Sequence, residues 1–200
     1  MAVAPKPRRS TDPAIALPVD TARRVAETSI GTNGYPDEHA VGVADYAGRI
    51  ADQLDLRGEL RAAVVAGALL HDIGKLLIDA AILGKPGPLT DAERRRVNEH
   101  PLDGERLVRG AVDARVVEVV RAHHERWDGA GYPEGLSAEE IPLAARVVAV
   151  ADAFLAMLEQ RPYRRPLSMA EALDELRTCA GTQFDPACVD ALVTALAAPR

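Results

Sequence analysis

The apolar residues of this chain recur every three or four positions, which is the spacing of α-helices rather than of strands. Between residues 39 and 56, for example, the apolar positions are Val43, Ala47, Ile50 and Leu54. The same spacing predicts helices over residues 58–72, 112–124, 142–158 and 186–197. No segment alternates with the two-residue period of a strand, so we expect an all-α fold, a single-domain helical bundle.

Other helices are indicated by their first residues. Capping boxes, in which a Ser or Thr precedes a Glu by three residues, predict helix starts at Thr90 and Ser168. His100-Pro101 can begin another helix, because proline is favoured at the first helical position. The helix over 142–158 is apolar nearly all round, which predicts a central place in the bundle.

Two segments lack this periodicity. Residues 1–20 contain four prolines and are typical of a flexible tail, so we place the globular domain at 21–200. Residues 125–141 contain three glycines and one proline and predict a long loop. Long loops in compact domains are usually functional or disordered.

The composition narrows the class of protein. A net charge of −6 argues against non-specific nucleic-acid binding, and a hydrophobic content of 48% suffices for a core. No apolar run approaches the ~20 residues that span a membrane, and no apolar segment of a signal peptide follows the basic N-terminus. Cys179 and Cys188 suit neither a disulfide scaffold nor a zinc knuckle. We therefore expect a cytoplasmic protein.

Histidine is the first candidate for chemistry. Each of the five histidines lies in or beside a predicted helix that has an apolar face. One such histidine is usually a satisfied core residue, but five indicate a shared metal site, since imidazole is the commonest metal ligand. These residues are His39, His71, His100, His123 and His124.

Two aspartates extend this set of ligands. Asp72 follows His71 at the end of an apolar helix, where a buried carboxylate is costly unless it is paired or binds a metal; a solvent-exposed helix end is the alternative. Asp152 shares the apolar helix over 142–158 with only one other charged residue, Arg146. Six positions apart, the two side chains do not share a face. We expect Asp152 to bind a metal and Arg146 to bind a phosphate, or else Arg146 to pair with another carboxylate.

Seven candidate ligands are too many for one metal that keeps an open position for chemistry. Two metals that share a bridging carboxylate use them better. Nitrogen-rich ligation without thiolates favours iron or manganese, with zinc, nickel or cobalt as alternatives. Two metals ~3.5–4 Å apart are typical of enzymes that hydrolyse phosphoryl esters.

The order of several motifs resembles the HD-GYP subfamily of the HD superfamily of metal-dependent phosphohydrolases. The matching segments are HDIGK at 71–75, ILGKPGPLT at 82–90, HHERWDGAGYPEGL at 123–136, IPLAARVVAVAD at 141–152, RPYR at 161–164 and GTQFDP at 181–186. Gly131-Tyr132-Pro133 is the signature tripeptide. The resemblance covers about residues 36 to 197. It implies an HD-type helical domain that hydrolyses cyclic di-GMP, a bacterial second messenger, to linear pGpG or GMP.

The resemblance also implies roles for single residues. The first metal would be held by His39, His71, Asp72 and Asp152. The second metal would be held by Asp72, His100, His123 and His124, so that Asp72 bridges the two. Lys75 would reach a phosphate oxygen or the leaving group, although a simple helix-end cation is the alternative.

The loop that contains the signature tripeptide borders the active site in the family and can contact diguanylate cyclase domains. The resemblance therefore implies a docking site at residues 129–135, and we expect Tyr132 to offer a stacking face to the substrate. The alternative is that the glycines and the proline only shape a turn, which leaves Trp127 and Tyr132 as exposed aromatic side chains without a role.

The sequence departs from the family pattern in three places. Tyr35 stands where some members carry a Glu that binds a third metal, so the resemblance implies two metals here. Asp79-Ala80 replaces the usual Pro-Asp, and Leu155 replaces an Asp.

Two alternatives to the leading interpretation remain: an HD-type enzyme for another nucleotide, and a non-catalytic module that senses a cyclic dinucleotide or docks partners. Loss of ligands would favour the latter, but all seven are present.

Overall fold

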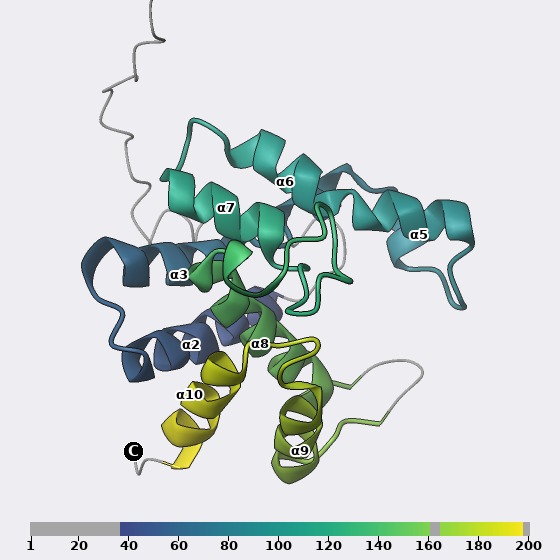
Figure 1. Cartoon of the computed structure of the whole chain (residues 1–200). Helices are drawn as coiled ribbons and strands as arrows, with labels where there is room; N and C mark the ends of the chain where they lie inside the picture. Colours follow the sequence, from purple (N-terminus) through teal and green to yellow (C-terminus); the bar gives the residue numbers. More distant parts are fainter. Residues whose placement is uncertain (1–36, 161–164, 198–200) are drawn as a thin grey trace, which may run out of the picture.

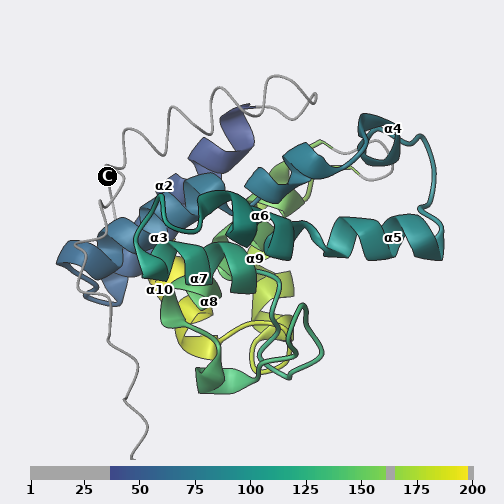
Figure 2. The same cartoon turned by 90° about the horizontal axis from the view of Figure 1, so that it is seen from above.

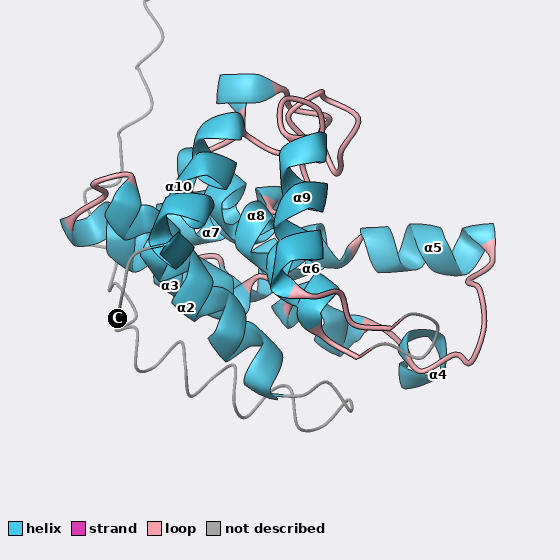
Figure 3. Ribbon diagram, turned by 90° about the horizontal axis from the view of Figure 1, so that it is seen from below, coloured by secondary structure: helices cyan, strands magenta, loops and turns pink. Residues whose placement is uncertain are grey.

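The computed structural model describes residues 37–160 and 165–197, which form a bundle of helices (Figure 1). Its longer helices are α2 (Asp37–Gln53), α3 (Gly58–Leu70), α5 (Asp91–Asn98), α6 (His100–Val108), α7 (Ala114–Ala122), α8 (Leu143–Leu158), α9 (Met169–Cys179) and α10 (Pro186–Ala197). Its short helical segments are η1 (Ile73–Leu77), α4 (Ala80–Leu83) and η2 (Ala138–Glu140). Within these residues there are isolated β-bridges but no strand (Figure 3), so the all-α prediction is confirmed. The predicted tail at 1–20 and Tyr35 lie outside the described residues.

Helix α8 lies in the middle of the bundle, as its apolar sequence predicts. It packs against α2, α3, α7, α9 and α10, and eight of its 16 residues are buried. The core consists mainly of Ala, Val and Leu, and Phe154 of α8 is its largest fully buried side chain. The ring of Phe154 meets that of Tyr46 edge to face at 5.0 Å between centroids. Small side chains on α8 therefore let five helices approach it closely.

The observed helix ends differ from the predicted ones at the functionally interesting positions. Helix α3 stops at Leu70, two residues before the predicted end, and η1 follows at Ile73. His71 and Asp72 thus lie at a junction between two helical segments. Helix α7 covers Ala114–Ala122, with Asp113 as its cap. His123 and His124 come directly after its last residue.

Helices α4 and α5 form an arm that extends from the bundle (Figures 2 and 3). Neither helix has a buried residue. The capping box at Thr90 is present, and the Lys85 ammonium lies 2.6 Å from the Glu93 carboxylate that completes it. The motif at 82–90 is therefore part of this arm and contributes no ligand to the histidine cluster.

The close packing of α3 on α7 leads to a prediction for Gly67. A Cβ at Gly67 would lie 2.5 Å from Cγ1 and 2.6 Å from Cβ of Val119, a side chain that is fully buried. Gly67→Ala should therefore lower the free energy of unfolding by about 1–3 kcal/mol through overpacking. Chemical denaturation measures this loss, and adding Val119→Ala should cost less in the Gly67→Ala background than in the wild type.

Gly48→Ala is the matched control, because Gly48 also lies inside a helix. A Cβ there would make only ordinary contacts, 3.6 Å from Val65 and 3.7 Å from Arg61. This variant should be neutral or more stable by up to ~1 kcal/mol, as alanine is the better helix former. Equal effects of the two substitutions would contradict the close packing at Gly67.

Candidate metal centre

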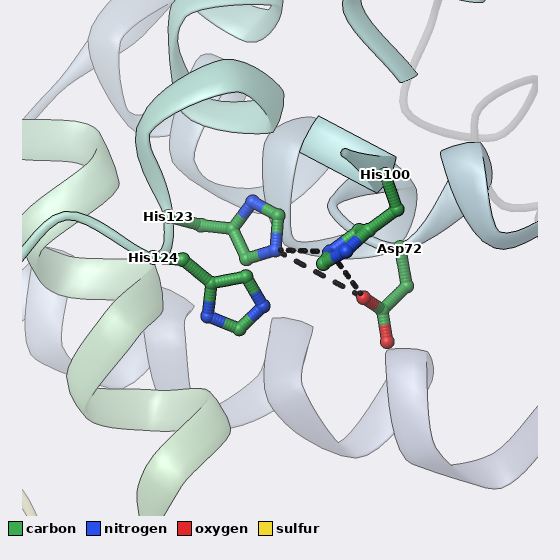
Figure 4. Close-up of side chains that lie close together, drawn as sticks. All are labelled: Asp72, His100, His123 and His124. Carbon is green, nitrogen blue, oxygen red and sulfur yellow. Dashed lines mark hydrogen bonds and ion pairs between the residues drawn. The ribbon is translucent and has the colours of Figure 1, made fainter. Parts of the chain in front are cut away.

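The structure brings the predicted ligands together from five separate helices. Two groups of ligand atoms form, and in each group all atoms lie within 4.8 Å of one another. The first group is His39, His71 and Asp72, and the second is Asp72, His100, His123 and His124. Asp72 belongs to both groups. Figure 4 shows the side chains of the second group converging on one point.

Helix ends supply most of these ligands. His71 and Asp72 follow α3, His100 begins α6, and His123 and His124 follow α7. The glycine of the HDIGK segment allows these ends to meet. A Cβ at Gly74 would lie 1.9 Å from the carbonyl oxygen of His100, so only glycine lets η1 lie directly against the start of α6.

Three histidines are oriented by their own backbone. The Nδ1 atoms of His71, His100 and His123 lie 2.7, 2.7 and 2.8 Å from carbonyl oxygens three residues earlier, at Ala68, Val97 and Val120. When Nδ1–H donates to such a carbonyl, Nε2 is left as an acceptor in the neutral ring. A second hydrogen bond of this kind is the usual way to fix the tautomer of a metal-binding histidine.

Two of these acceptor atoms face each other. Nε2 of His100 lies 3.1 Å from Nε2 of His123. Two lone pairs cannot form a hydrogen bond without a proton between them, and a cation bound by both nitrogens removes the conflict. The short distance therefore favours a metal at the second group.

The carboxylate of Asp72 points one oxygen toward each group. Its Oδ1 lies 3.3 Å from Nε2 of His100 and 3.9 Å from Nε2 of His123. Its Oδ2 lies 3.4 Å from Nε2 of His71. This is the arrangement expected of a carboxylate that bridges two metals.

Two buried atoms without hydrogen-bond partners also indicate that the cluster suits divalent metals. Among the described buried side chains, Nε2 of His71 and Oδ1 of Asp72 have no hydrogen-bond partner. Leaving such atoms unsatisfied is unfavourable. Both point at the groups described above, and a metal at each group would satisfy them.

Asp152 lies beside the first group. Its Oδ1 is 3.0 Å from Nε2 of His39 and 4.0 Å from Nε2 of His71. The other ring nitrogen of His39 contacts Glu159, which the sequence analysis did not single out. Glu159 follows Asp152 by seven residues, which is two helical turns. This spacing is the one feature of the sequence that indicates that Glu159 lies on the same side of the helix as Asp152.

The pKa values in the cluster differ between the histidine beside the aspartates and the histidine beside another imidazole. Burial opposes the charged form of His71, yet Asp72 and Asp152 raise the pKa of His71 to about 9. Burial also opposes ionisation of Asp72, yet Lys75 and His71 hold its pKa well below its usual range. In contrast, burial and the neighbouring His100 lower the pKa of His124 to about 3. His71 thus carries a proton near pH 7 that a metal would replace.

Lys75 lies next to the proposed bridge. Its Nζ is 2.5 Å from Oδ2 of Asp72, and both side chains are largely buried. This places an ammonium group beside the carboxylate oxygen of Asp72 that faces His71. Lys75 also lies in the last turn of η1, as the alternative of a helix-end cation requires, and its ammonium is held by Asp72.

The signature loop packs onto the cluster through a buried carboxylate. Glu125 accepts hydrogen bonds from the backbone N–H groups of Glu134, Gly135 and Leu136, at 2.7, 3.2 and 3.1 Å. It is 4% exposed. The sequence analysis quoted this residue within its motif but assigned it no role. Glu125 ties the far side of the loop to the segment that carries His124.

The loop borders the histidine cluster, as the resemblance implies. Tyr132 stacks on His124, with 4.9 Å between ring centroids, and its backbone N–H donates to the carbonyl oxygen of His124. Burial raises the pKa of the Tyr132 hydroxyl to about 12, so this group stays protonated. Tyr132 and Trp127 are both half-buried, which corrects the alternative of exposed aromatic side chains.

Arg146 has a different partner from the expected phosphate. Its Nη1 lies 2.7 Å from Oδ2 of the buried Asp185, and its Nε donates to the carbonyl oxygen of Ile141. Its guanidinium also lies over the ring of Trp127. This is the alternative that the sequence left open, an ion pair with another carboxylate. Arg146 thus joins α8 to the loop and to the residue that precedes α10.

Comparison with known proteins identifies the family to which this chain is similar. The HD domain family matches residues 16–188. Two relatives are the "Cyclic di-GMP phosphodiesterase response regulator RpfG" of Xanthomonas campestris pv. campestris, 42% identical over 86% of the chain, and the "3'3'-cGAMP-specific phosphodiesterase 3" of Vibrio cholerae, 39% identical over 81% of the chain. The chain spans 45% and 35% of their lengths, less than half of each.

Solved structures show the same fold. A cyclic GMP-AMP-specific phosphodiesterase of Vibrio cholerae superposes with a TM-score of 0.67 at 20% identity, over 94% of this chain and 49% of that one. No helix in the described segments is both long and apolar enough to span a bilayer. The resemblance to the HD-GYP subfamily is confirmed, and the chain belongs to the HD domain family.

Proposed function

We propose that this chain is a dinuclear-metal phosphodiesterase domain that hydrolyses cyclic di-GMP to linear pGpG, with GMP at most a slow product. The observation that carries the proposal is the position of Asp72, whose two oxygens face two separate groups of imidazoles. A cyclic dinucleotide as substrate is supported by the relative from Xanthomonas. Because this substrate is an internal messenger of bacteria, the proposal places the domain in the cytoplasm.

The proposed cofactors are two divalent metals, of which iron and manganese suit nitrogen-rich ligands best. His39, His71, Asp72 and Asp152 would hold the first, and Asp72, His100, His123 and His124 the second. When bound, the pair would supply Lewis-acid activation of water and neutralise charge on the phosphodiester. Asp72 would keep both positions in register, since it faces both groups.

Two further residues contribute directly in this proposal. Lys75, held at the bridge by Asp72, would stabilise negative charge on a phosphate oxygen or on the leaving ribose oxygen. His124 covers one face of the Tyr132 ring, and the other face would stack on a guanine base. The segment 129–135, which is joined to the site by Glu125, would be the surface for a cyclase domain.

A second candidate substrate has its own support. The relative from Vibrio cholerae is named for 3'3'-cGAMP at an identity close to that of the Xanthomonas relative. The metal centre suits any phosphodiester, so it does not choose between two purine bases. A non-catalytic sensing module is disfavoured, because every proposed ligand is in place.

The metal centre gives the first prediction here. Protein loaded anaerobically with iron or manganese should contain about two metals per chain by elemental analysis. Asp72→Ala should lose both, because its carboxylate faces both groups, whereas His39→Ala should lose chiefly one. Asp45→Ala, which removes a charge from an exposed position of α2, is the control and should keep both. Similar mild losses in Asp72→Ala and His39→Ala would contradict a bridging Asp72.

Metal binding should also depend on pH. The pKa of His71 is raised to about 9, so its ring is protonated in the metal-free protein near pH 7. A metal must displace this proton, so its observed affinity should rise with pH, by about tenfold per pH unit for each proton released. Calorimetry in buffers of different ionisation enthalpy counts the protons. An affinity that is constant between pH 6 and 8 would contradict this.

The substrate assignment is tested with metal-loaded protein and a panel of cyclic dinucleotides, with products separated by chromatography. We expect cyclic di-GMP to give pGpG. Tyr132→Ala should raise KM by about tenfold through lost stacking, which is worth ~1–3 kcal/mol per base, without changing the metal content. Tyr132→Phe, which keeps the ring, should leave KM nearly unchanged.

Other outcomes decide between the alternatives. Cleavage of 3'3'-cGAMP with cyclic di-GMP left intact would favour the second candidate. Binding of a dinucleotide without turnover by fully metal-loaded protein would favour the sensing module.

A further inference from the structure

Glu159 lies at the end of α8 and contacts a proposed ligand without belonging to either group of ligands. Its Oε1 and Oε2 lie 2.9 and 3.0 Å from Nδ1 of His39. On the opposite side of the same ring, Nε2 of His39 lies 3.0 Å from Oδ1 of Asp152. The imidazole of His39 is thus held between two carboxylates of one helix.

The packing of α2 against α8 sets this arrangement. Asp152 and Glu159 are seven residues apart, so they lie on the same face of α8, two turns from each other. Between them Leu155 packs against α2 so closely that a Cβ at Gly42 would lie 2.6 Å from its Cδ2. The two helices therefore hold His39, on the first turns of α2, level with the gap between the two acidic residues.

His39 differs in this respect from the other histidines that are tied down. His71, His100 and His123 donate from Nδ1 to a backbone carbonyl within their own turn. His39 uses a carboxylate from a helix that is 120 residues away in sequence. A carboxylate is the stronger acceptor, and it makes the opposite nitrogen a better ligand.

We propose that Glu159 is a positioning residue for the first metal. It fixes His39 with the proton on Nδ1 and directs Nε2 at the metal position shared with His71, Asp72 and Asp152. Glu159 itself does not contact the metal. This inference rests on the metal centre proposed above and adds a residue that controls how tightly one of its two positions binds.

The test measures the two metal affinities separately. Metal-free protein is titrated with Co²⁺ by calorimetry, and the electronic absorption of the bound ions is recorded in parallel. Glu159→Ala should weaken one of the two positions by about 10–100-fold, the same position that His39→Ala loses, and should leave the other unchanged. Glu159→Gln keeps an oxygen acceptor for Nδ1–H and should recover most of the affinity.

Glu118→Ala is the matched control, because it removes the same charge from an exposed position of α7. It should bind both metals as the wild type does. Melting of the metal-free proteins provides a second readout, and Glu159→Ala should melt near the wild type because its side chain is partly exposed.

Each other outcome overturns a defined part of the argument. Wild type that binds no metal would overturn the metal centre itself. Wild type with two metals and a Glu159→Ala variant that binds like Glu118→Ala would overturn the role of Glu159 alone. If Glu159→Gln loses the position as completely as His39→Ala does, Glu159 is a ligand rather than a positioning residue.

Discussion

The rest of the structure depends on keeping the Asp72 carboxylate buried among imidazoles. A buried carboxylate and neighbouring buried ring nitrogens are costly unless each has a partner. Here Oδ1 of Asp72 and Nε2 of His71 have none among the described side chains, while His100 and His123 present their Nε2 atoms to each other. A bound cation at each group resolves these conflicts together. The fold therefore keeps an arrangement that is unfavourable without metal and favourable with it.

The helices serve this arrangement through their ends. A side chain at a helix end can point along the axis and still donate to the last turn, as His71, His100 and His123 do. The ends of α3 and α7 and the start of α6 meet and together supply five of the candidate ligands. The core has small side chains because α8 must lie close to five other helices. Dense packing then limits how far the ligands can move.

A second layer of contacts holds the cluster from outside. Glu159 contacts His39, Glu125 holds the signature loop, and Asp185 pairs with Arg146, whose guanidinium lies over Trp127. The loop in turn places Tyr132 on His124. Each of these carboxylates has a protein partner of its own. They thus differ from Asp72, whose Oδ1 has no hydrogen-bond partner among the described residues.

The sequence by itself determined the helical class, most helix positions and the set of candidate metal ligands. Apolar spacing and capping boxes are local properties, and a histidine or aspartate in an apolar helix carries its chemistry wherever that helix packs. Only the tertiary structure decided the partners. Whether Arg146 meets a phosphate or Asp185, and whether Glu159 reaches His39, depends on how helices far apart in the chain pack together. A displacement of one helical turn would change either contact, and no local pattern in the sequence encodes that distance.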